Sequence, residues 1–281
     1  MEFKHREDEV IKEIEQIKSG IPCLLSHGSY QATSTGRLIE GCRICTEMKS
    51  MSFVLGYRCN VKCDFCFVYS YISSEYEEDE KYNRRACFKD FCRNKDSIDG
   101  IGFTGGETLL YLPEIEKYTS KIREEKPDIY LWVYTNGIEA NKENLKILKD
   151  LGINEIRFNL AASDYNPKII EKLGIARELF EYIAVEVPAY PKQKNKLIKS
   201  LDKFEYYGID QLNMQELLVN NNNINRLEGD IYQAGIMFTQ KYFLYGSRKL
   251  TYDVIKFCIN KGYSFTVNDC SARRFGRIEA G

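Results

Sequence analysis

The stretch Tyr57–Phe67, with the sequence YRCNVKCDFCF, carries Cys59, Cys63 and Cys66 in a C-x3-C-x2-C spacing. Thiolates are soft, anionic iron ligands, and short spacings let one loop wrap a cluster of iron and sulfide. Three cysteines leave the fourth iron of a [4Fe–4S] cluster without a protein ligand, as in catalytic metal sites that keep one position open. Taken alone, the same spacing would also suit a zinc site or a chance cysteine loop.

This loop follows a candidate strand, 52–56, after which the chain alternates helices with strands. Further strands are expected at 100–103, 130–134, 155–159, 183–187 and 211–214. Helices are expected near 84–95, 113–124, 141–151, 166–179 and 193–206. The alternation predicts a parallel sheet with helices packed outside it and right-handed crossovers. Six repeats fall short of the eight that close a barrel, so we expect an α/β fold with a partial (β/α)6 barrel.

Regions on either side of this core are expected to add to it. The N-terminal region, 1–50, combines an amphipathic helix at 2–19 with an irregular, cysteine-containing segment from 20 to 41. The core is expected to occupy 51–217, and its Glu-rich stretch 69–82 to form a solvated loop or lid. An α/β extension is expected to cap the barrel over 218–281, with a polar loop at 220–223, helices near 224–235 and 250–261, and strands at 242–245 and 263–267.

Composition limits the classes of partner. The chain has 40 basic and 41 acidic residues, so its net charge of −1 gives no overall field that would attract nucleic acid. No apolar run approaches the ~20 residues that span a bilayer, and the charged N-terminus lacks the apolar core of a signal peptide. We therefore expect a cytoplasmic protein without a membrane partner, and we do not expect nucleic acid as its substrate.

Glycine-rich and polar segments end the predicted strands. Gly102–Glu107 (GFTGGE) ends the second strand, Tyr134–Gly137 (YTNG) the third, Asn159 the fourth and Val185–Pro188 (VEVP) the fifth. Ligands bind parallel α/β sheets at these carboxyl ends. With the three-cysteine loop and its aromatic Phe65, these segments resemble the motifs of the radical S-adenosylmethionine (SAM) superfamily, in the same order along the chain.

The resemblance implies a [4Fe–4S] cluster on Cys59, Cys63 and Cys66 whose open iron binds the amino and carboxylate groups of SAM. In that family the reduced cluster cleaves SAM to methionine and a 5′-deoxyadenosyl radical, which abstracts hydrogen from the substrate. The resemblance further implies a reducing electron donor such as flavodoxin or ferredoxin. The residues expected to contact SAM are Phe65, Gly105, Gly106, Glu107, Thr135, Asn136, Asn159 and Val187.

A second group of cysteines surrounds the segment Gly41–Cys45 (GCRIC). A reducing compartment disfavours disulfides, and a C-x2-C pair is a common half-site for zinc or an iron–sulfur cluster. We hypothesise that Cys42, Cys45 and Cys270 converge on a second metal, with Cys23 as a fourth ligand. The alternative is that these are buried thiols, because free cysteine is among the most buried residue types.

Stretches outside the shared motifs resemble the branch of the superfamily described as related to pyruvate formate-lyase activating enzyme. They are Gly41–Cys45, Glu186–Pro191, Leu212–Leu217 and Asn268–Phe275, the last with one extra residue. The expected function is reductive SAM cleavage for hydrogen abstraction from an unidentified substrate, with a peptide or protein favoured. The alternatives are a non-catalytic iron–sulfur electron carrier or sensor, and a radical SAM enzyme that acts on a small molecule or RNA.

Overall fold

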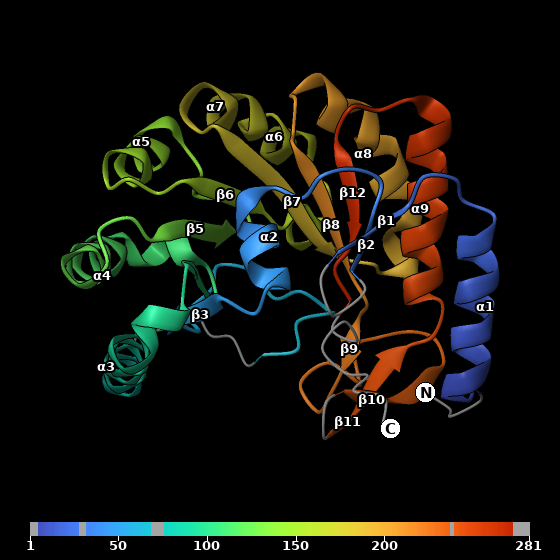
Figure 1. The fold of residues 1–281 in the computed structure, drawn as a ribbon, viewed down its shortest axis with the longest axis horizontal. Coiled ribbons are helices and arrows are strands. Elements are labelled where there is room, and N and C mark those ends of the chain that lie inside the picture. The colour runs from blue at the N-terminus through green and yellow to red at the C-terminus, as the bar shows by residue number, and fades with distance from the viewer. Residues whose placement is uncertain (1–4, 28–31, 69–75, 237–238, 272–281) are drawn as a thin grey trace.

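A computed structural model describes residues 5–27, 32–68, 76–236 and 239–271 (Figure 1). Within these ranges, a nine-stranded sheet has the order β1-β2-β12-β8-β7-β6-β5-β4-β3. Neighbouring strands from β12 to β3 are parallel, whereas β2 pairs antiparallel with both β1 and β12. The strands are β1 (Leu25–His27), β2 (Ala32–Ser34), β3 (Ser50–Gly56), β4 (Gly100–Gly105), β5 (Tyr130–Thr135), β6 (Glu155–Phe158), β7 (Tyr182–Pro188), β8 (Gln211–Gln215) and β12 (Thr266–Asp269). All six core strands expected from the sequence are confirmed.

Helices cover the outer side of this curved sheet, and α2 (Glu40–Thr46) lies on its inner side (Figure 1). The helix α1 (Glu7–Ser19) packs beside α9 (Ser247–Lys261) at one end of the sheet. The remaining helices are α3 (Glu77–Asn94), α4 (Leu112–Glu125), α5 (Lys142–Asp150), α6 (Pro167–Ile170), α7 (Lys172–Leu179) and α8 (Lys194–Tyr206). The fold is thus the open α/β arrangement of parallel strands with outer helices that the sequence predicted.

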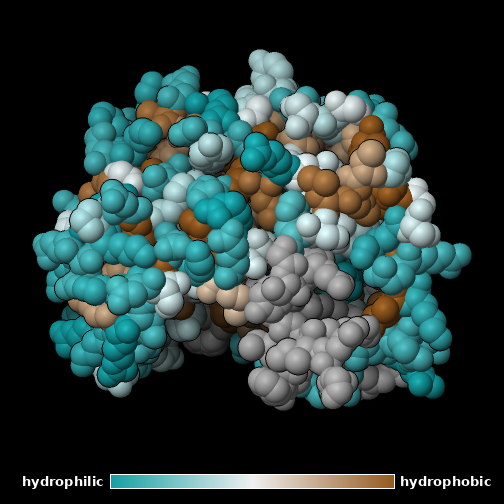
Figure 2. Space-filling model, in the orientation of Figure 1, coloured by the Kyte–Doolittle hydropathy of each residue, from teal (hydrophilic) through white to brown (hydrophobic). Residues whose placement is uncertain are grey.

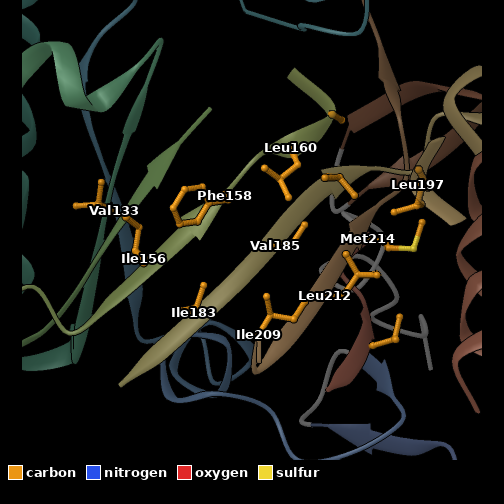
Figure 3. Close-up of a cluster of buried hydrophobic side chains, with 14 of the residues drawn as sticks. Val133, Ile156, Phe158, Leu160, Ile183, Val185, Leu197, Ile209, Leu212 and Met214 are labelled. Atoms are coloured by element: carbon orange, nitrogen blue, oxygen red, sulfur yellow. The ribbon is translucent and has the colours of Figure 1, made fainter. Parts of the chain in front are cut away.

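Alternation along the strands sends apolar and polar side chains to opposite faces of the sheet. Ile156 and Phe158 of β6 belong to the hydrophobic core under the outer helices, beside Val185 of β7 (Figure 3). Glu155 and Arg157, which alternate with them, face α2, because a Cβ on Gly41 of that helix would lie within 3 Å of both. The outer face is therefore an apolar core, and the inner face is polar.

The buried guanidinium of Arg157 organises this inner face. Its Nε donates to Glu155 at 2.5 Å, and its Nη1 donates to Glu186 at 2.9 Å and to the Tyr134 hydroxyl at 3.1 Å. The guanidinium also lies 5.0 Å from the centroid of the Trp132 ring. A buried charge is tolerated only when it is paired and hydrogen-bonded, and these four side chains meet that condition.

Three expectations for local structure are wrong. The helix expected near 224–235 is instead the strand β10 (Ile231–Ile236), which pairs with β11 (Thr239–Leu244) and thereby joins β9 (Leu218–Val219) in a small three-stranded sheet. Pairing with a neighbouring strand overrides the local pattern there. Part of the stretch expected to be a loop, 69–82, starts α3, whose first turn contains the acidic residues Glu77–Glu80 and is stabilised by them. Residues 69–75 lie outside the described ranges.

The segment 20–41, expected to be irregular, contributes β1, β2 and the start of α2. The helices confirmed most closely are α4, α5, α8 and α9, each within a few residues of its expected range. Figure 2 shows hydrophilic residues over much of the face on which α2 lies, with apolar residues between them. None of the described helices is long and apolar enough to cross a membrane.

Candidate functional site

The three-cysteine loop lies between β3 and α3, at the carboxyl edge of the parallel sheet. Cys59 is buried, and Cys63 and Cys66 are partly buried. Burial raises the pKa of the Cys59 thiol and raises that of Cys63 to about 12, and the charge of Cys66 adds to both shifts. Because ionised thiols here would repel one another in a poorly solvated place, a bound cation would stabilise them.

The three thiols are the ligand type of an iron–sulfur cluster. In the parts of the chain that the structure describes, no group of three or more His, Cys, Asp or Glu side chains is arranged to hold a single metal ion. A single zinc ion requires all its donors at about 2.0–2.3 Å from one point. A [4Fe–4S] cluster takes its thiolates on different irons, so its ligands lie further apart. The chemistry and spacing of Cys59, Cys63 and Cys66 therefore fit such a cluster.

Two glycines let the end of β4 lie directly against the start of the cysteine loop. Gly105 has a φ of +143°, and a Cβ on Gly105 or Gly106 would lie 2.1 Å from Gly56 O or 2.2 Å from Arg58 O, respectively. Gly106 N donates to Gly56 O at 2.8 Å, and Glu107 N donates to Arg58 O at 2.9 Å. The glycines thus permit close contact with the loop that carries the cysteines, while their contact with SAM stays a prediction.

The carboxylate of Glu107 links the segment that follows β4 to the end of β5. It is fully buried and accepts hydrogen bonds from Leu109 N at 3.1 Å, the Thr135 hydroxyl at 2.7 Å and Asn136 N at 2.7 Å. Burial nevertheless raises the pKa of Glu107 to about 7. In this arrangement both Glu107 and Thr135 position the edge of the sheet, and direct contact of either side chain with SAM stays a prediction.

Asn136 lies beside the first cysteine. Its Nδ2 donates to Asn60 Oδ1 at 2.7 Å and lies 3.9 Å from Cys59 Sγ, while its Oδ1 accepts from Ile138 N at 3.0 Å. Asn60 in turn donates to Glu139 at 3.2 Å. The end of β5 therefore meets the cysteine loop. This amide is well placed to tune a metal centre, because hydrogen bonds near coordinating sulfurs affect their chemistry.

A cavity of about 380 Å³ opens beside the second cysteine. Phe65 forms one wall, and its ring meets that of Tyr190 edge-on at a centroid distance of 6.3 Å. An aromatic wall with charged groups nearby suits a ligand that combines a flat ring with polar groups. The full lining consists of Lys62, Cys63, Asp64, Phe65, Ala161, Ala162, Asp164, Tyr190, Lys192, Gln193 and Lys196. Sequence reasoning found Cys63 and Phe65 but missed Tyr190 and Gln193, which follow β7.

Two of the expected SAM contacts, Asn159 and Val187, make contacts within the protein, and their contact with SAM stays a prediction. Asn159 begins the short 3-10 turn Leu160–Ser163, where its side chain accepts from Ala162 N at 3.3 Å. Val187 is 1% exposed and belongs to the hydrophobic core. Asn159 thus caps a turn, as asparagine commonly does, and Val187 points to the apolar side because side chains alternate along β7.

The second metal site on Cys42, Cys45, Cys270 and Cys23 stays a prediction. Cys42 lies on α2, where burial raises its pKa to about 11 and its Sγ accepts from Gln211 Nε2 at 3.0 Å and Asn213 Nδ2 at 3.3 Å. Cys23 is exposed, and Cys45 and Cys270 are partly buried. Among the described residues, no group of three or more His, Cys, Asp or Glu side chains is arranged to hold a single ion, and Cys42 contacts the amides of Gln211 and Asn213 on β8.

This chain is similar in sequence to a protein-family model and to two curated proteins. Residues 53–187 match the family model described as "Radical SAM superfamily". A protein of Methanocaldococcus jannaschii named "Putative glycyl-radical enzyme activating enzyme" is 27% identical over 223 residues, which cover 71% of this chain and 55% of that protein. GTP 3′,8-cyclase of Aquifex aeolicus is 30% identical over 177 residues, 58% of this chain and 52% of that protein. The chain spans about half the length of the curated relatives it matches.

Solved structures share the fold. SuiB of Streptococcus suis, bound to its precursor peptide SuiA, matches with a TM-score of 0.54 and 13% identity over 92% of this chain and 52% of that chain. Coproporphyrinogen III oxidase (HemN) of Escherichia coli matches with a TM-score of 0.54 and 15% identity over 76% of this chain and 53% of that chain. On the family match and the cysteine loop together, residues 53–187 form a domain of the radical SAM superfamily, and the chain is similar to a protein named as a glycyl-radical enzyme activating enzyme.

Proposed function

We propose that this chain holds a [4Fe–4S] cluster on Cys59, Cys63 and Cys66 and cleaves SAM reductively for hydrogen abstraction. The observation that carries the proposal is the cysteine loop itself, fixed against Gly105–Glu107 at the carboxyl edge of the sheet and bordering a cavity lined by Phe65. The three cysteines would hold the cluster, which would supply the one electron needed to cleave SAM at its S–C5′ bond into methionine and a 5′-deoxyadenosyl radical for hydrogen abstraction from the substrate.

The protein's own groups would bind and orient the cofactors. Phe65 and Tyr190 offer aromatic surface for the adenine of SAM. Asn136 would hold the loop around Cys59. The electron would come from a reducing partner such as flavodoxin or ferredoxin. The cavity beside the cysteines favours an enzyme over a non-catalytic iron–sulfur carrier, because a carrier would need the cysteines but no cavity.

The experiment is anaerobic reconstitution, reduction with dithionite, addition of SAM and detection of 5′-deoxyadenosine by mass spectrometry. We expect the product from the wild type and from Cys92→Ala, a control thiol on α3, and none from Cys63→Ala. A chain that holds four irons yet releases no 5′-deoxyadenosine would favour the carrier instead.

We further propose a peptide or protein substrate, because the Methanocaldococcus jannaschii relative is named as an activating enzyme for a glycyl-radical enzyme. A nucleotide is the second candidate, since the Aquifex aeolicus relative is a GTP cyclase. The two are separated by measuring 5′-deoxyadenosine release with GTP, and with the macromolecular and small-molecule fractions of a cell extract. Stimulation by the macromolecular fraction alone supports the protein substrate, and stimulation by GTP with a new nucleotide product supports the other.

A further inference from the structure

A turn that lies more than 150 residues beyond the cysteine loop in sequence forms hydrogen bonds to the backbone of that loop. This asparagine turn, residues 220–226, follows β9. Asn220 and Asn222 donate their Nδ2 groups to Phe67 O at 2.6 and 3.1 Å. Asn223 donates its Nδ2 to Phe65 O at 3.1 Å. Three side-chain amides therefore bind the carbonyls that flank the third cysteine.

The last residue of the turn, Arg226, binds the carbonyls of two cysteines. Its Nη1 donates to Cys63 O at 2.8 Å, and its Nη2 donates to Cys66 O at 3.2 Å and to Asn222 O at 2.6 Å. A guanidinium is suited to this because its donors lie in one fixed plane. The positive charge of Arg226 is thereby held next to two of the three candidate cluster ligands.

The asparagine turn is itself held in shape by internal bonds. Asn223 is fully buried, and its Oδ1 accepts from Asn220 N at 2.9 Å while its Nδ2 also donates to Leu218 O at 2.9 Å. Asn220 Oδ1 accepts from Asn222 N at 3.0 Å. Asparagine forms such local bonds to backbone groups readily. The donors are thus fixed before they meet the cysteine loop.

We propose that the asparagine turn positions the cysteine loop for the cluster, with Arg226 and Asn223 as its main positioning residues. The inference rests on the cluster proposed above. Four carbonyls of the loop, those of Cys63, Phe65, Cys66 and Phe67, are directed toward the turn. In a planar trans peptide the N–H of the next residue points the opposite way, so the turn also sets where the loop's amide donors point. It therefore controls both how firmly the cluster is held and how easily it is reduced.

The test compares Arg226→Ala, Arg226→Lys and Asn223→Ala with Arg123→Ala. Arg123 is a matched control, because it also bridges two backbone carbonyls, those of Pro127 and Gly152, far from the cysteine loop. Release of iron to a chelator is followed in each reconstituted variant. Changing residues that orient metal ligands typically lowers affinity about 10-fold to 100-fold. We expect release to be about 10-fold faster in Arg226→Ala and Asn223→Ala, and unchanged in Arg123→Ala.

The reduction potential of the cluster, measured by electron paramagnetic resonance, distinguishes the effect of the Arg226 charge from the effect of its hydrogen bonds. We expect it to become more negative in Arg226→Ala, because a nearby positive charge favours the added electron, and to change less in Arg226→Lys. Wild-type iron release and an unchanged potential in both alanine variants would overturn the proposal.

The cluster-free chain keeps this test independent of the proposed function. If the wild type takes up no cluster, the proposed function fails, and hydrogen exchange of residues 62–68 still tests the turn. Faster exchange there in Arg226→Ala and Asn223→Ala than in Arg123→Ala supports the positioning role. Equal exchange in all the variants would overturn it.

Discussion

Replacing Gly106 with alanine should displace the cysteine loop. The new Cβ would lie 2.2 Å from Arg58 O and 2.7 Å from Tyr57 O, both backbone atoms that no rotamer change can move. Ordinary contact begins near 3.4 Å, so the loop would have to retreat by roughly 1.2 Å from a close-packed position. That retreat would break the two bonds that join β4 to the loop, Gly106 N to Gly56 O and Glu107 N to Arg58 O.

The expected cost combines overpacking with the lost bonds. Overpacking typically costs 1–3 kcal/mol and each net hydrogen bond 0.5–1.5 kcal/mol, which together give about 2–6 kcal/mol. We expect Gly106→Ala to lower Tm by several degrees and to hold less than half of the wild-type iron after reconstitution. The assays are thermal unfolding by circular dichroism, iron analysis and 5′-deoxyadenosine release.

Gly20→Ala is the matched control. Gly20 follows α1 as its C-cap with a φ of −91°, and its new Cβ would have its nearest neighbour, Ile17 O, at 3.6 Å. We expect wild-type Tm and iron content from this variant, because alanine adopts that conformation without strain. Wild-type stability and iron content in Gly106→Ala would refute the claim that β4 and the cysteine loop pack directly against each other.

Three further outcomes are expected. Because burial raises the pKa of Glu107 to about 7, its contribution to the free energy of unfolding is fully present below the unfolded value of 4.5 and is lost as pH rises through 7. Urea unfolding from pH 5 to 8 should show a fall of about 2.5 kcal/mol that Glu107→Gln lacks. Arg157→Met should lower the free energy of unfolding in urea by about 3–5 kcal/mol, because it leaves the buried Glu155 and Glu186 without their cation. A decrease below about 1 kcal/mol would contradict that pairing. Cys42→Ala should leave metal content unchanged after reconstitution, because Cys42 contacts amides, and loss of zinc or iron would restore the second metal site.

Periodicity in the sequence located the elements of the core because each buried strand is a short apolar run between turn residues. The strand β10 and the helix α2 escaped prediction for different reasons. β10 pairs with β11, the next strand along the chain, and that pairing overrides the local helical pattern. α2 packs on the polar face around Glu155 and Arg157, which lie more than 100 residues further along the chain, and local pattern carries no signal for such partners.

The residues of the candidate site likewise include some that the sequence reveals and some that it does not. The spacing of Cys59, Cys63 and Cys66 and the position of Gly105–Glu107 after a strand are local features, so the sequence reveals them. Tyr190 in the cavity wall and the asparagine turn lie far along the chain from the cysteine loop. Asparagine and arginine in a loop are ordinary solvent-facing residues until the fold places carbonyls opposite them. Only the structure could identify them.

The cysteine loop is held at both ends by the fold alone. At its start, Glu80 accepts from Tyr57 N at 2.8 Å and from the Tyr111 hydroxyl at 2.7 Å, and that hydroxyl accepts from Arg58 N at 2.8 Å. At its end, Arg226 binds the cysteine carbonyls. In a zinc finger the metal must order the chain, so its binding energy is spent on folding. Here the entropic cost of ordering the loop is already offset by its contacts with side chains that are distant in sequence. Loss of the cluster should therefore leave this chain folded, and more of the binding energy remains available for holding the cluster with only three thiolates.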